Sequence, residues 1–205
     1  MAPERPDTAF TPGYHGFLAF AESIGAELAP FQRRIARAHF GHRKVVAILP
    51  KGNYKTTTCA LLGLHHLLVT PGAEVRIGAA SRRQAEICLK RMKGFARHPL
   101  VHDPITITHF ELRVAEGDLM VVSAEGELLH GDSPSLLVGD EVWAWKDRAE
   151  LLEAMESSLL KRPDSRLILI STSAPVLDSP PSPNGCALRA AGARARAPGP
   201  GRGVR

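Results

Sequence analysis

The feature that most limits the fold of this 205-residue chain is a strand, a turn and a helix in succession between residues 45 and 68. Val45–Leu49 is an unbroken apolar run, as in a buried strand of a parallel sheet, and Thr56–Leu68 carries apolar residues at helical intervals. The turn between them contains Gly52 and ends in Lys55 and Thr56. A strand, a Gly-containing turn, Lys-Thr and a helix together form the layout of a phosphate-binding loop.

The chemistry of such a loop follows from the start of the helix. Free N–H groups and the positive end of the helix dipole attract an anion. Lys55 would add a charge on the β- and γ-phosphates, and the Thr56 hydroxyl would ligate Mg²⁺. The common pattern has Gly where this chain has Leu49 and Tyr54, so only Gly52 is a permissive residue in the turn. An ordinary strand-to-helix turn is therefore the alternative for the motif taken alone.

A second apolar run, residues 135–139, ends in the acidic pair Asp140 and Glu141. Ligands of open α/β sheets bind at the carboxyl ends of the strands, which is where these carboxylates would lie. We expect Asp140 to hold Mg²⁺ as the acidic partner of Thr56, and Glu141 to activate the attacking water as a general base. The alternative is that the pair caps a helix that begins near Asp147 or lies in a solvated turn.

A third apolar run, Arg166–Ile170, leads into Ser171, Thr172 and Ser173. The sheet order would bring this strand beside the phosphate loop, so Thr172 is a candidate sensor of the γ-phosphate. A strand that ends in a polar turn is the alternative.

The remaining pattern alternates helices and strands, which predicts a mostly parallel sheet covered on both faces. We expect helices over residues 17–28, 31–40, 82–96 and 148–160, with Ser81 as the N-cap of the third. We expect further strands over 75–79, 105–110, 111–114 and 119–123, with a turn at 116–118.

The stretch from Phe31 to Pro180 resembles the ATPase domain of the large terminase subunit, the motor that packages DNA into tailed-phage capsids. The resemblance is carried by the deviant loop 51–56, by the approach 130–141 to the acidic pair and its continuation 142–145, and by 171–174. It implies an α/β P-loop NTPase with a three-layer α/β/α arrangement, and it implies ATP and Mg²⁺ as ligands. It also implies that Lys51 joins Lys55 in neutralising phosphate charge, and that Gln32 contacts adenine.

The nucleotide-binding residues expected from the motifs and the resemblance are Gln32, Gly52, Asn53, Tyr54, Lys55, Thr56, Thr57 and Thr172. Gln32 can also be read as a surface residue of a helix. The chain departs from the family pattern in having Lys51 where Arg is common and Tyr54 where Gly is common. Because Lys is a point charge and Arg a two-pronged donor, the first departure bears on the turnover rate more than on binding.

The resemblance implies double-stranded viral DNA, a portal protein and a small terminase subunit as partners, and a ring of identical subunits in the assembled motor. A helix over 82–96 would lie near the DNA track, although its basic residues also suit a solvated face: Arg82, Arg83, Lys90, Arg91, Lys93 and Arg97. No nuclease activity is expected from this chain. Two other hypotheses are a helicase-like P-loop ATPase with a different task and an inactive prophage relic.

Charge divides the chain into three segments. Residues 1–178 hold 21 basic and 21 acidic side chains, so the whole net charge of +5 lies in the arginines beyond them. We expect a lead segment at 1–28, the ATPase domain at 29–180 and a disordered tail at 181–205, rich in Ala, Arg, Gly and Pro. A frameshift or truncation near Pro180 would explain this tail, and a basic DNA-binding arm is the alternative.

Three widely spaced cysteines, Cys59, Cys88 and Cys186, argue against a disulfide framework or a structural zinc site. No apolar stretch reaches the roughly 18 residues that a membrane span requires, and no signal sequence opens the chain. We therefore expect a protein of the bacterial host cytoplasm with no membrane contact.

Overall fold

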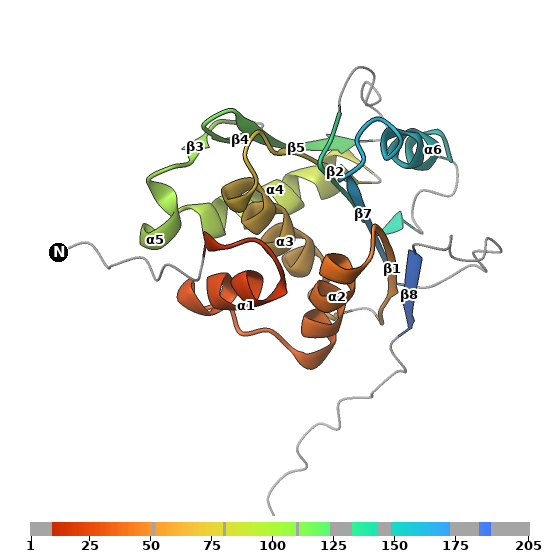
Figure 1. Cartoon of the computed structure of the whole chain (residues 1–205), viewed down its shortest axis with the longest axis horizontal. Coiled ribbons are helices and arrows are strands. Elements are labelled where there is room, and N and C mark those ends of the chain that lie inside the picture. Colours follow the sequence, from red (N-terminus) through yellow and green to blue (C-terminus); the bar gives the residue numbers. More distant parts are fainter. Residues whose placement is uncertain are drawn as a thin grey trace, which may run out of the picture.

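An eight-stranded sheet forms the centre of the computed structural model, which describes residues 10–50, 52–79, 81–109, 111–123, 133–142, 149–172 and 185–189. Its strand order is β3-β4-β5-β2-β6-β7-β1-β8 (Figure 1). The strands β5 (Gly117–Ser123), β2 (Glu74–Ala79), β6 (Leu136–Asp140), β7 (Arg166–Ser171), β1 (Lys44–Ile48) and β8 (Gly185–Arg189) pair in parallel. At one end β3 (Thr106–Ile107) and β4 (Glu111–Val114) continue the sheet antiparallel.

Helices cover both faces of the sheet. Figure 1 shows one layer of helices on one face: α1 (Tyr14–Ser23), α2 (Pro30–Gly41), α3 (Lys55–Val69), α4 (Arg82–Ala96) and α5 (Pro99–His102). On the other face lies α6 (Ala149–Ser158). No helix in the described part of the chain combines the length and the apolar character that crossing a membrane would need.

Alternation along the strands produces two separate cores. Ile77, Val138 and Ile168 are buried in the larger core, which they share with residues of α1 to α5. Leu137, Leu167 and Leu169 point to the opposite face and form the smaller core with Met155 of α6. Because successive strand residues point to opposite faces, β6 and β7 supply apolar residues to both cores. The expected three-layer, mostly parallel P-loop fold is confirmed.

Most predicted elements occur within a few residues of their expected positions. The helix expected over 82–96 is α4, and the Ser81 hydroxyl accepts a hydrogen bond from the Gln84 amide at 3.4 Å, as an N-cap does. The turn predicted at 116–118 lies slightly earlier, at residues 115–116, because Gly117 and Asp118 already belong to β5. The reversal lies at Ala115, whose φ is 49°, and Asp118 donates its amide to the Ala73 carbonyl at 2.8 Å.

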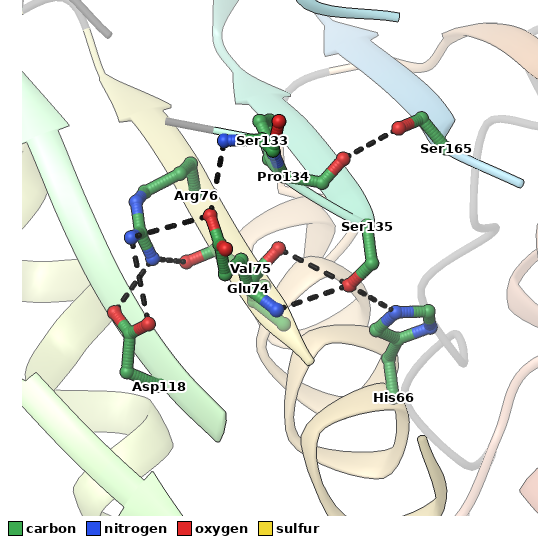
Figure 2. A network of polar contacts seen from close by, with 9 residues as sticks. All are labelled: His66, Glu74, Val75, Arg76, Asp118, Ser133, Pro134, Ser135 and Ser165. Atoms are coloured by element: carbon green, nitrogen blue, oxygen red, sulfur yellow. Dashed lines mark hydrogen bonds and ion pairs between the residues drawn. The ribbon is translucent and has the colours of Figure 1, made fainter. Parts of the chain in front are cut away.

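A network of polar contacts occupies the amino-terminal edge of the sheet (Figure 2). Arg76 of β2 donates to both carboxylate oxygens of Asp118 of β5, at 2.6 and 3.4 Å. The Glu74 carboxylate accepts the Ser133 amide at 3.1 Å, and the Ser135 hydroxyl lies 2.8 Å from Nε2 of His66. These contacts tie β2, β5 and the entrance to β6 to the far end of α3.

The strand β8 lies inside the segment expected to be a disordered tail. It pairs in parallel with β1, with Lys44 opposite Gly185 and Ile48 opposite Arg189. No sequence pattern predicts this strand, because the segment has no alternation of apolar residues. Pairing at a sheet edge uses backbone groups that every residue except proline offers, so it does not require such a pattern.

Candidate active site

The site lies at the carboxyl edge of the sheet, where three neighbouring strands end. β1 pairs with β7 and β7 with β6, so the ends of these strands are adjacent: Ile48 lies opposite Ser171, and Ile170 opposite Asp140. Beyond β1 the Leu49 amide donates to the Ser171 carbonyl at 2.9 Å, after which the chain turns into α3. The parallel arrangement therefore brings the phosphate-loop motif, the acidic pair and the Ser-Thr motif to one edge.

The turn into α3 is held by unusual backbone conformations. Gly52 has a φ of 90° and Tyr54, the N-cap of α3, has a φ of 43° in the left-handed region. Tyr54 thus occupies the position where the common pattern has Gly. Gly is common there because it adopts the left-handed conformation without strain, whereas a side chain makes that conformation costly. The Asn53 side chain donates to the Pro50 carbonyl at 3.1 Å and closes the turn. Lys51 lies outside the described residues.

The first turn of α3 presents free donors. The first hydrogen bond within the helix runs from the Thr58 amide to the Tyr54 carbonyl at 3.1 Å. Within the described part of the chain, no backbone carbonyl accepts from the amides of Lys55, Thr56 or Thr57. Such amides, with the helix dipole behind them, suit the oxygens of a phosphate group.

Asp140, the last residue of β6, faces this turn. The Thr56 hydroxyl donates to one oxygen of its carboxylate, Oδ2, at 2.7 Å. The other oxygen, Oδ1, is buried and has no hydrogen-bond partner among the described residues. Burial raises the pKa of Asp140, and the hydrogen bond from Thr56 opposes that rise in pKa. A buried carboxylate oxygen without a donor is well suited to a hard cation, which would offset the cost of its burial.

Glu141 connects the loop lysine to β7. Its Oε1 lies 3.4 Å from the ammonium of Lys55, and its Oε2 accepts the Thr172 hydroxyl at 3.1 Å. The Lys55 side chain is buried, and its ammonium also donates to the Pro50 carbonyl at 3.3 Å. Glu141 has a φ of 53°, a left-handed conformation that non-glycine residues adopt mainly where the surroundings enforce it.

Gln32 lies behind the phosphate loop. It is 4% exposed, so it is not the surface residue of the alternative reading. Its side-chain oxygen accepts the Ala29 amide at 2.9 Å, and its side-chain nitrogen donates to the Thr58 hydroxyl at 2.9 Å. That hydroxyl in turn donates to the Tyr54 carbonyl at 3.3 Å. The start of α2 is thereby linked to the N-cap of α3.

The donor set fits a magnesium–phosphate ligand. The Thr56 hydroxyl and the Asp140 carboxylate are oxygen groups of the kind that Mg²⁺ prefers, and Lys55 adds positive charge. No group of three or more His, Cys, Asp or Glu within the described ranges could hold a metal ion. A cation here would therefore complete its octahedral shell with phosphate and water oxygens, as Mg²⁺ commonly does.

The structure brings together Gly52, Asn53, Tyr54, Lys55, Thr56, Thr57, Asp140, Glu141 and Thr172, with Gln32 one layer behind. The acidic pair contacts Thr56, Lys55 and Thr172. Residues 143–148, which separate the pair from α6, lie outside the described part of the chain, so the helix-cap alternative stays a prediction. Two contacts escaped the sequence analysis: Gln32 with Thr58, and Arg91 of α4 with the Thr57 hydroxyl at 2.6 Å. Both depend on how helices pack, and the sequence carries no local signal for them.

Comparison with known proteins identifies a single family. The family model of the terminase large subunit ATPase domain matches residues 31–181. The chain is similar to the bacteriophage HK97 large terminase, with 26% identity and a TM-score of 0.65 over 72% of this chain and 34% of that one. The chain thus spans about a third of the HK97 protein. No curated protein matches the sequence.

Two further structures share the fold at lower identity. The large terminase ATPase domain of Thermus phage P74-26 matches with 21% identity and a TM-score of 0.66, over 76% of this chain and 68% of that one. Dbp5 of S. cerevisiae matches with 15% identity and a TM-score of 0.57, over 86% of this chain and 52% of that one.

Proposed function

This chain belongs to the family of terminase large subunit ATPase domains, and on that premise we propose that it hydrolyses ATP to drive viral double-stranded DNA into a capsid. The observation that carries the proposal is the convergence of Thr56 with Asp140 and of Lys55 with Glu141 and Thr172 at one edge of the sheet. A turn that only connected a strand to a helix would need neither a buried lysine nor a buried carboxylate oxygen that no described residue contacts by a hydrogen bond.

Each residue has a distinct role in this proposal. The free amides of α3 cradle phosphate oxygens, together with the turn Gly52–Tyr54 and the hydroxyl of Thr57. Lys55 and Lys51 neutralise phosphate charge. Thr56 and Asp140 hold Mg²⁺, which supplies charge neutralisation on the phosphates when bound. Gln32 is the proposed contact to adenine, as the family resemblance implies.

Glu141 serves as the general base that accepts a proton from the attacking water. In the ligand-free arrangement its two oxygens contact Lys55 and Thr172. Phosphate oxygens would compete for the Lys55 ammonium, which would release one oxygen of Glu141 toward water. Thr172 then connects the state of Glu141 to β7, so loss of the γ-phosphate can be reported to the rest of the motor.

The partners follow from the family rather than from a feature of this fold. We propose double-stranded viral DNA, a portal protein and a small terminase subunit as partners, and a ring of identical subunits in the cytoplasm of a bacterial host. A helicase-like ATPase with another task shares the fold, so stimulation by double-stranded DNA rather than by RNA distinguishes the two functions.

The test is ATP turnover by the purified chain, measured as phosphate release with and without double-stranded DNA. We expect Lys55→Ala to abolish turnover, with Lys44→Ala as a control that removes a half-buried lysine paired to Glu156. We expect Glu141→Gln to retain ATP binding and to lose 10²- to 10⁴-fold in rate, the usual contribution of a general base. Glu153→Gln, at an exposed position of α6, is its matched control.

Unchanged phosphate release by Glu141→Gln would remove the base assignment. A folded wild-type chain that neither binds nor hydrolyses ATP in the presence of Mg²⁺ would overturn the proposed function and favour the inactive relic.

A further inference from the structure

Arg91 stands apart from the other basic residues of α4. It is exposed, yet its guanidinium Nη1 donates to the Thr57 hydroxyl of α3 at 2.6 Å. Its neighbours behave differently. Lys93 donates to the carbonyl of His109 at 2.7 Å, away from the loop, and Lys90 makes no hydrogen bond or ion pair with any described residue. Within the described ranges no carboxylate pairs with Arg91. An exposed arginine with no acid beside it remains free to bind an anion.

Thr57 places this arginine beside the candidate phosphate site. It is the third residue of α3, and its amide is one of the free amides of the first turn. Successive residues of a helix point about 100° apart, so Thr56 and Thr57 face different neighbours. Thr56 contacts Asp140 of β6, whereas Thr57 contacts Arg91 of α4. In the proposed function Lys55, Glu141 and Thr172 lie at the γ-phosphate end of the site. Arg91, which contacts Thr57 instead, therefore flanks the site away from that end.

We propose that Arg91 is a further nucleotide-contacting residue, which binds the α-phosphate side of ATP while Thr57 holds its side chain in place. The proposal rests on the proposed function, because it takes the nucleotide to lie against α3. A guanidinium carries five N–H donors in a planar fork. One donor can bind the Thr57 hydroxyl while others reach a phosphate oxygen. A lysine ammonium on the same helix could not make both contacts with the same fixed geometry.

The proposed position of the Arg91 charge, beside the α-phosphate, predicts how its loss affects nucleotide binding and turnover. ATP and ADP both carry an α-phosphate, so loss of Arg91 should weaken the binding of both nucleotides to a similar extent. Removal of an interaction made equally in the ground state and the transition state raises KM and leaves kcat unchanged. Lys55, which faces the β- and γ-phosphates, should instead affect ATP more than ADP.

The experiment compares Arg91→Ala, Arg91→Lys and the control Lys90→Ala, without DNA. Binding of ATP and of ADP, each with Mg²⁺, is measured by calorimetry, ATP turnover by phosphate release, and folding by thermal denaturation. For Arg91→Ala we expect an increase of about fivefold to tenfold in both dissociation constants and in KM, with kcat within twofold of wild type. Arg91→Lys should recover part of the affinity, and Lys90→Ala should match wild type.

Three outcomes would overturn the inference. The first is nucleotide affinity unchanged in Arg91→Ala, even if its melting temperature falls, since the contact with Thr57 would then only join two helices. The second is an equal loss in Lys90→Ala, which would show a general charge effect. The third is weaker ATP binding with unchanged ADP binding, which would place Arg91 at the γ-phosphate. In each case loss of turnover in Lys55→Ala would leave the proposed function standing.

Discussion

The charged groups at the amino-terminal edge of the sheet have partners within the protein: Arg76 donates to Asp118, and Glu74 accepts a backbone amide. At the carboxyl edge, by contrast, one carboxylate oxygen of Asp140 has no hydrogen-bond partner among the described residues. The two edges belong to the same sheet and both contain buried charge. At the first edge a nearly buried arginine has a two-pronged carboxylate partner (Figure 2). At the second, a threonine hydroxyl is the only hydrogen-bond donor to Asp140 from a described side chain.

This difference distinguishes charged side chains that stabilise the fold from charged side chains that are available to bind a ligand. A buried polar group normally has its partners within the protein, because an unpaired one costs free energy. Backbone strain follows this division in part. Two of the three described non-glycine residues with positive φ, Tyr54 and Glu141, flank the candidate site, and the third, Ala115, lies in the turn before β5. Strain and missing partners thus coincide at the edge where the ligand is proposed to bind.

The largest expected effect tests the amino-terminal edge. Asp118→Asn should lower the free energy of unfolding by about 2–3 kcal/mol, because it leaves Arg76 buried with a weaker partner. Urea unfolding measures the change. Asp164→Asn is the matched control, since Asp164 pairs with Arg162 at 2.8 Å with its side chain 62% exposed. An exposed pair should contribute less than about 1 kcal/mol. Equal losses in the two variants would break the comparison.

The next effect is pH dependence at the same edge. Burial, with Arg166 and Arg162 nearby, lowers the pKa of His66 to about 4, and burial lowers the pKa of His65 to about 4 as well. Both histidines are neutral in the folded protein, while the unfolded chain takes up protons below its ordinary pKa of 6.5. Stability is therefore complete above pH 6.5 and is lost as the pH falls toward 4.

For His65 alone the loss between pH 7 and pH 5 should be about 2 kcal/mol, from about 1.4 kcal/mol for each pKa unit. Urea unfolding at a series of pH values measures it. His65→Phe, a residue among Phe17, Phe20 and Phe40, should reduce this slope, and His102→Phe at an exposed position should not. A stability that stays constant between pH 7 and 5 would contradict the assignment of these histidines as neutral.

A smaller effect of opposite sign is expected at the carboxyl edge. Burial raises the pKa of Asp140, so its ionised form is unfavourable without a cation. Asp140→Asn should therefore raise the free energy of unfolding by about 1 kcal/mol in the absence of Mg²⁺, as substitutions at functional sites often do. The same variant should lose the stabilisation that Mg²⁺ with ATP confers on the wild type. A destabilised Asp140→Asn would mean that this carboxylate supports the fold, as Asp118 does.

The smallest effect concerns the strained N-cap of α3. Tyr54 is 68% exposed, so its replacement by Gly removes little buried surface. Relief of the left-handed conformation and the greater flexibility of Gly in the unfolded chain oppose each other, and the net change should stay within about 1 kcal/mol. Tyr54→Val should lower stability by less than about 1 kcal/mol, because Tyr54 already bears most of the cost of positive φ and a β-branched residue adds only to it. Equal melting temperatures for Gly and Val would show that the loop relaxes.

The strand ends were predictable because their causes are local. An apolar run that stops at Asp140 or Ser171 specifies both a strand and its polar end, and parallel strands bring such ends to one edge. The left-handed Tyr54 could be suspected only from the Gly expected at that position. The contacts of Gln32 with Thr58 and of Arg91 with Thr57 depend on the packing of α2 and α4 against α3, which periodicity does not determine. Lys51 remains a prediction, since it lies outside the described residues.

The strand β8 was beyond the reach of sequence patterns, and its position has a consequence for the phosphate loop. With β7 on one side and β8 on the other, β1 has a hydrogen-bonding neighbour along both flanks from Lys44 to Ile48. Amide hydrogens of a strand enclosed in this way exchange slowly with heavy water, because release requires the sheet to open. The candidate phosphate loop therefore follows directly from a well-protected segment of the backbone, and deuterium uptake in β1 would report whether β8 remains paired with it.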